Sequence, residues 1–127
     1  MMRLKSDFTQ LLEAAIDGRL DRAEAQWDRR TALGVVVAAH GYPEAPRKGD
    51  VITGLPPDAD YCVTFHAGTA LVDGKLVVTG GRVLCVTALG DSVRAAQKLA
   101  YEAVDQVAFD GAQFRRDIGH RALKKPA

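Results

Sequence analysis

The hydrophobic and polar positions of the chain follow a helical spacing near its start. Apolar side chains recur at this spacing over residues 6–18, with Ser6 as a good N-cap and Gly18 as a C-terminal stop. Residues 20–27 repeat the spacing more briefly and predict a second short helix, in which Trp27 is a packing residue. We therefore expect a helical segment at the start of the chain.

The longest helix is predicted near the other end, over residues 92–107, with Asp91 or Ser92 as its N-cap. One face of this helix is apolar, which indicates that it packs against the rest of the domain. The residues of that stripe are Val93, Ala96, Ala100, Ala103, Val104 and Val107.

Two apolar runs between these helices predict a buried strand and a central strand. Residues 33–39 form a nearly unbroken β-branched run, which is typical of a buried strand. Residues 82–88 alternate, with Val83, Cys85 and Thr87 on one face and apolar residues on the other. Because both faces of this second strand are mostly apolar, we expect it to lie in the centre of a sheet.

A hairpin and one further strand complete the pattern. Residues 61–66 alternate and predict a strand. Asp73 and Gly74 separate the apolar runs 70–72 and 75–78. This is a strong hairpin signal, because a type I′ turn needs positive φ at both central positions.

Together these elements predict an α+β fold class: a small, mostly antiparallel sheet packed by the long helix. We expect residues 1–30 to be the helical segment, residues 31–123 to form the main domain, and residues 124–127 to be a solvated basic tail. The chain has 127 residues and is 47% hydrophobic, which suffices for one compact core.

Charge and composition exclude several classes of function. The formal net charge of +1 argues against nucleic acid as a partner, since such an interface needs a basic stripe. The apolar runs are too short to cross a bilayer, and no signal-peptide pattern is visible. We therefore expect no membrane partner and a cytoplasmic location.

The chain offers little for metal binding or catalysis. Cys62 and Cys85 lie within apolar alternations, which favours buried thiols over a disulfide or a metal site. The three histidines lack metal-ligand spacing, so no metal site is expected. We also find no complete set of catalytic residues.

Two glycine-containing turns carry the candidate binding chemistry. In the first, Gly68 lies between His66, which can donate or accept a hydrogen bond, and the hydroxyl of Thr69. In the second, Gly80 and Gly81 precede an arginine, and their missing side chains would let main-chain N–H groups approach an anion. Alternatively, His66 could have only a structural role, and Gly80 and Gly81 could serve only to shape a hairpin.

Two cations accompany these turns. The planar fork of Arg82 suits a carboxylate or a phosphate, and the alternative is an ion pair with a surface carboxylate. Lys48 lies in a loop and could bind a phosphate or simply be solvated. Neither residue by itself decides between these readings.

Five sequence blocks, in this order, resemble the C-terminal domain of the glycinamide ribonucleotide synthetase (phosphoribosylamine–glycine ligase) family. Each block alone is modest, but the order and spacing are specific and cover nearly the whole chain. The blocks span residues 34–43, 48–56, 65–69, 80–90 and 116–122.

The resemblance implies an ATP-dependent ligase that joins glycine to 5-phosphoribosylamine in purine biosynthesis. In this family an ATP-grasp domain activates the glycine carboxylate with magnesium and ATP, and its acidic metal-binding motif is not found here. We therefore expect residues 1–30 to follow that domain, the Mg and ATP ligands to lie outside this chain, and the chain alone to be inactive.

The resemblance also implies a place for the candidate residues. In this family the C-terminal domain packs beside the ATP-grasp portion, its expected partner, and forms one wall of the substrate cleft. Arg82 is then expected to contact the phosphate of phosphoribosylamine or the carboxylate of glycine. The other expected substrate-binding residues are Gly81, Gly80, His66, Gly68, Thr69 and Lys48.

Two alternatives stay open at this point. The chain could be a non-catalytic subunit that complements a separate ATP-grasp chain. It could also be a free-standing binder of small phosphorylated metabolites.

Overall fold

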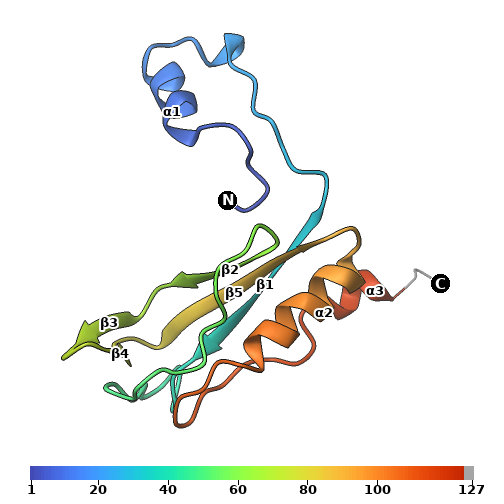
Figure 1. Ribbon diagram of the computed structural model, residues 1–127. Helices are drawn as coiled ribbons and strands as arrows, with labels where there is room; N and C mark the ends of the chain where they lie inside the picture. Colours follow the sequence, from blue (N-terminus) through green and yellow to red (C-terminus); the bar gives the residue numbers. More distant parts are fainter. Residues whose placement is uncertain (125–127) are drawn as a thin grey trace.

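The computed structural model describes residues 1–124, and most of the predicted basic tail, residues 125–127, lies outside them. The elements follow the predicted α+β order (Figure 1). They are α1 (Phe8–Ile16), the 3₁₀ turn η1 (Leu20–Arg22), β1 (Thr31–Ala38), β2 (Cys62–His66), β3 (Thr69–Val72), β4 (Lys75–Val78), β5 (Arg82–Gly90), α2 (Val93–Val104) and α3 (His120–Leu123).

Three strands form an antiparallel sheet with the order β1-β5-β2. The central place of β5 confirms the prediction from its two apolar faces. The second sheet is the β3–β4 hairpin, whose turn residues Asp73 and Gly74 have φ values of 50° and 74°. Both values are positive, as the predicted turn requires.

Helix α2 packs on one face of the three-stranded sheet, against β5 and β1 (Figure 1). Ala96 and Ala100 are fully buried at this contact, and their small side chains let the helix approach the strands closely. Ser92 is the N-cap, because its Oγ accepts a hydrogen bond from the Ala95 N–H at 3.1 Å.

The opposite face of the sheet, which we call the open face, carries apolar side chains that remain exposed. Val36 is 44% exposed and Phe65 is 41% exposed, with the half-buried Cys85 paired to both across the strands. Burial alternates along β1 as far as Val37, and Ala38 is buried as well. Gly34 and Val36 are exposed, so the prediction of a buried strand is wrong for these two residues. An apolar run predicts burial only if both faces of the sheet are covered.

A β-bulge interrupts the alternation along β5. Val37 pairs with Leu84 and Ala38 pairs with Arg82, so Val83 is an extra residue on β5. Val83 is 0% exposed and Leu84 is 1% exposed, so both lie in the core. The predicted position of Val83 on the face of Cys85 is therefore wrong.

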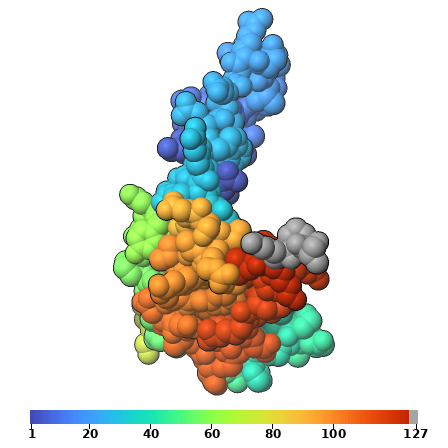
Figure 2. All heavy atoms as spheres, turned by 90° about the vertical axis from the view of Figure 1, so that its right-hand side faces the viewer, coloured from blue at the N-terminus to red at the C-terminus, as the bar shows by residue number. Residues whose placement is uncertain are grey.

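Residues 1–30 form an arm that stands away from the sheet, as the blue segment in Figures 1 and 2 shows. No residue of α1 is buried. Its N-cap is Asp7, whose Oδ1 accepts from the Thr9 N–H at 2.8 Å, and not the predicted Ser6. The Ser6 hydroxyl instead accepts from the Gln26 N–H at 2.6 Å.

The second predicted helix is reduced to the single turn η1. The Asp28 N–H donates to the Arg3 carbonyl at 2.6 Å, and the Lys5 N–H donates to the Gln26 carbonyl at 2.8 Å. Because these bonds hold the chain extended, no helix can continue there. Trp27 is 56% exposed, so its predicted packing role is also wrong.

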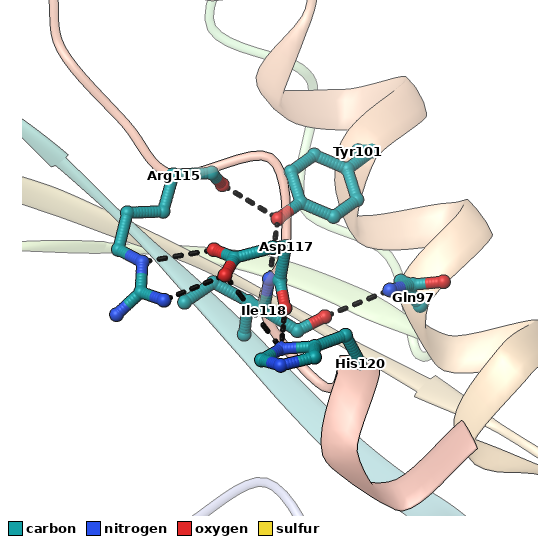
Figure 3. Close-up of polar contacts among 6 residues, drawn as sticks. All are labelled: Gln97, Tyr101, Arg115, Asp117, Ile118 and His120. Atoms are coloured by element: carbon teal, nitrogen blue, oxygen red, sulfur yellow. Dashed lines mark hydrogen bonds and ion pairs between the residues drawn. The ribbon is translucent and has the colours of Figure 1, made fainter. Parts of the chain in front are cut away.

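The segment that follows α2 is fastened to this helix by polar contacts (Figure 3). The Tyr101 hydroxyl donates to the Arg115 carbonyl at 2.6 Å and accepts from the Ile118 N–H at 3.1 Å. Gln97 donates to the Ile118 carbonyl at 2.8 Å. Two parallel bonds from Arg115 lower the pKa of Asp117 below its usual range.

Candidate functional site

The two predicted glycine turns meet where β2 leads into β3 and β4 leads into β5. The Gly68 N–H donates to the Arg82 carbonyl at 3.0 Å, and the Thr79 N–H donates to the Gly68 carbonyl at 2.8 Å. A Cβ atom at position 68 would lie 2.8 Å from the Cα of Gly80. Glycine therefore lets the two main-chain segments cross in direct contact.

A hollow opens beside this crossing, on the open face. Gly68, Gly81 and Arg82 line it, so the structure brings three of the predicted site residues together. Tyr42 and Cys85 also line it, and the sequence did not single them out as part of a binding site. The signals for Tyr42 in the sequence were its place in the block of residues 34–43 and the rigid turn expected from Pro43 after it.

Arg82 supplies the positive charge of the hollow. Its side chain is exposed, and within residues 1–124 its guanidinium has neither a carboxylate partner nor a hydrogen-bond acceptor. The main-chain N–H groups of Gly80 and Gly81 also lack an acceptor among these residues. A guanidinium without an ion-pair partner is suited to a phosphate or a carboxylate.

Arg47, in contrast to Arg82, is held in ion pairs within the domain. Arg47 donates to Asp50 Oδ2 at 2.8 Å and to Asp110 Oδ2 at 2.6 Å, and its own N–H donates to the His40 carbonyl at 2.8 Å. These hydrogen bonds to the two carboxylates raise the pKa of Arg47 above its usual range. Arg47 therefore anchors the loop that borders the hollow, and its charge is already matched.

The remaining predicted residues do not line the hollow. His66 Nδ1 lies 3.0 Å from the Thr69 hydroxyl, so these two residues pair with each other. Gly80 contacts the main chain of Gly68 at the crossing. Lys48 is exposed, and it precedes Gly49, whose N–H donates to the Val78 carbonyl at 2.8 Å.

Within residues 1–124, no three His, Cys, Asp or Glu side chains are grouped so that they could hold a metal ion. These residues therefore offer no site in which three protein side chains hold a metal ion. In the same part of the chain, every helix is too short or too polar to span a bilayer.

Comparison with known proteins gives a consistent answer. Residues 32–121 match the family model described as "Phosphoribosylglycinamide synthetase, C domain". A phosphoribosylamine–glycine ligase of Ralstonia nicotianae is 62% identical over 98% of this chain, and one of Vibrio parahaemolyticus is 52% identical over 98%. The chain spans only 30% and 29% of these two relatives.

A solved structure agrees with this result. The crystal structure of phosphoribosylamine–glycine ligase from Thermotoga maritima matches 85% of this chain with a TM-score of 0.69 and 40% identity, and the match covers 27% of that protein. The sequence blocks, the antiparallel α+β fold and the family match agree. The chain therefore belongs to the phosphoribosylglycinamide synthetase C-domain family.

Proposed function

We propose that this chain is the C-terminal part of an ATP-dependent ligase that joins glycine to 5-phosphoribosylamine, and that its open face forms one wall of the substrate cleft. The names of the relatives support the reaction. The observation that carries the position of the site is that Arg82, an exposed arginine without an ion-pair partner in residues 1–124, lines the hollow beside the glycine crossing. Arg82 would pair with the phosphate of phosphoribosylamine or the carboxylate of glycine.

The surroundings of Arg82 support this role. A planar guanidinium can form two parallel hydrogen bonds to such an anion, and the N–H groups of Gly80 and Gly81 can add further donors. His66, Thr69 and Lys48 do not line the hollow, and in this proposal they would contact parts of the substrate that extend beyond it. These residues bind and orient the substrate, and no proton transfer is assigned to them.

Magnesium and ATP would supply the activation of the glycine carboxylate. Residues 1–124 contain no group of three metal-ligating side chains, which supports a place for these ligands in the remaining part of the enzyme. The isolated chain should then be inactive.

The open face would be covered by that remaining part. The first relative is more than three times as long as this chain, so an enzyme of that length would contain a partner of sufficient size. Met1 and Met2 of the arm line a hollow on this face with Phe65 and Cys85, so the arm already borders it. The exposed side chains of α1, Phe8 among them, provide a second apolar surface for the same partner.

A complementation assay tests the proposal. Glycine-dependent ADP release is measured for this chain alone, for the separately produced remainder of the ligase, and for their mixture. Activity only in the mixture supports the proposal, and activity in this chain alone would overturn it. If the mixture is inactive, the same assay on both parts joined as one polypeptide must show activity, or the assignment fails.

Variants then test the site. Arg82→Ala should lower kcat/KM for phosphoribosylamine or for glycine about 100-fold, as expected for a lost charge-assisted contact. Arg94 provides the matched control, because it is an exposed arginine on α2 without a partner in residues 1–124. Equal effects of Arg82→Ala and Arg94→Ala would contradict the assigned position of the site.

Alkylation of cysteine tests the docking of the open face. The half-buried Cys85 lies on this face, whereas burial of Cys62 raises the pKa of its thiol and slows its reaction. Adding the remainder of the ligase should protect Cys85 from iodoacetamide and leave the slow reaction of Cys62 unchanged. Restored activity without protection of Cys85 would place the contact elsewhere.

A further inference from the structure

The direction of Arg82 depends on the bulge at Val83. Without the extra residue, the alternation that places Cys85 on the open face would turn Arg82 toward the core. With it, Arg82 pairs with Ala38 and shares its face, and its side chain is exposed. The bulge thus keeps a charged group out of an apolar core, where its burial would be costly.

The turn before Arg82 is held by a distant loop. The Ala39 N–H donates to the Gly81 carbonyl at 2.8 Å, and the Tyr42 N–H donates to the Ala39 carbonyl at 3.1 Å. The loop that contains Tyr42 is in turn anchored by Arg47. The main chain at Gly81 is therefore fixed from one side by an ordered segment.

The aromatic ring of Tyr42 packs against the main chain of Gly81. A Cβ atom on Gly81 would lie 2.5 Å from Tyr42 Cδ2 and 2.9 Å from Cε2, so the ring lies directly over the glycine. Tyr42 is 38% exposed, and its hydroxyl has no hydrogen-bond partner within residues 1–124. The contact of Tyr42 with the turn at Gly81 is therefore made by the aromatic ring and not by the hydroxyl.

Building on the proposed function, we propose that Tyr42 is a positioning residue for Arg82. Its ring supports the main chain at Gly81, so that the guanidinium is held in place over the hollow before the anionic substrate arrives. A guanidinium fixed in this way loses less freedom on binding than one on a mobile turn. Tyr42 itself need not touch the substrate.

The test is a double-mutant cycle in the complete ligase, made as one polypeptide that contains this chain. Tyr42→Ala should raise the KM for the substrate that Arg82 contacts about tenfold, with kcat and the KM for ATP changed less than twofold. Tyr42→Phe should restore the original KM, because it keeps the ring. In the double variant, Tyr42→Ala should add almost nothing to the loss caused by Arg82→Ala.

A second variant approaches the same contact from the other side. Gly81→Ala would displace the ring and should raise the same KM, which keeps the test usable if Tyr42→Ala fails to fold. Thermal unfolding of each variant shows whether it is folded at the assay temperature.

The two proposals fail in different ways. If Arg82→Ala has no effect, the proposed binding role of Arg82 is wrong. If Arg82→Ala lowers activity but the two substitutions act additively, or if Tyr42→Ala and Gly81→Ala leave the KM unchanged, the positioning role of Tyr42 alone is wrong.

Discussion

Gly68 and Gly80 touch through their main chains: a Cβ atom on Gly68 would lie 2.8 Å from both Cα and N of Gly80. Since these are backbone atoms, they cannot move aside as a flexible side chain would. Gly68→Ala should lower the free energy of unfolding by about 1–3 kcal/mol, measured by urea denaturation. At Gly80 the nearest contact of an added Cβ is 3.2 Å, so Gly80→Ala should cost less, and the reverse order would contradict this geometry.

The N-cap of α2 gives a second prediction. Because the Ser92 hydroxyl accepts the Ala95 N–H, Ser92→Ala should lower the free energy of unfolding by about 1 kcal/mol. Asp91, which the sequence left as an equal candidate for the cap, is the control. Urea denaturation should show a smaller loss for Asp91→Ala, and a larger one would mean that Asp91 is the cap.

The Tyr101 hydroxyl connects α2 to the C-terminal segment through two hydrogen bonds. Tyr101→Phe removes both and should lower the free energy of unfolding by about 1–2 kcal/mol. Tyr61→Phe is a suitable control, since the Tyr61 hydroxyl has no partner in the described part of the chain. Denaturation curves that coincide for the two variants would show that the bonds in Figure 3 do not stabilise the fold.

Asp28 supports a prediction about pH. Hydrogen bonds from the side chain and main chain of Arg30 lower the pKa of Asp28 to about 2. The unfolded value is about 3.9, so this ion pair contributes fully above that pH and is lost as the pH falls through about 2. An NMR titration of the Asp28 carboxyl carbon should show the low midpoint.

Arg30→Ala should raise that midpoint toward the unfolded value, whereas Arg29→Ala, next in the chain, should leave it in place. A midpoint that does not respond to Arg30→Ala would show that the main chain alone holds the carboxylate.

Much of the fold could be predicted from local patterns. The two apolar faces of residues 82–88 indicated a central strand, and Asp73-Gly74 located the hairpin, because each signal depends on neighbouring residues. The N-cap of α2 could be limited to Asp91 or Ser92, because a cap is also recognised from neighbouring residues.

The predictions that were wrong concern features that depend on contacts between distant parts of the chain. The bulge at Val83 depends on pairing with β1, and the extended residues near Trp27 depend on hydrogen bonds to residues 3–5. At the site, the glycine turns were visible in the sequence, but the contact of Tyr42 with Gly81 joins positions far apart in the chain. Such contacts leave no trace in the spacing of residues.

The bulge at Val83 also has a consequence for genetic variation. The orientation of Arg82 is set by the number of residues between it and Cys85, as well as by their identity. An in-frame loss of one codon there would keep the arginine in the protein but turn it toward the core, since a shift of one residue exchanges the two faces of a strand. Such an allele would retain every charged group and still be defective.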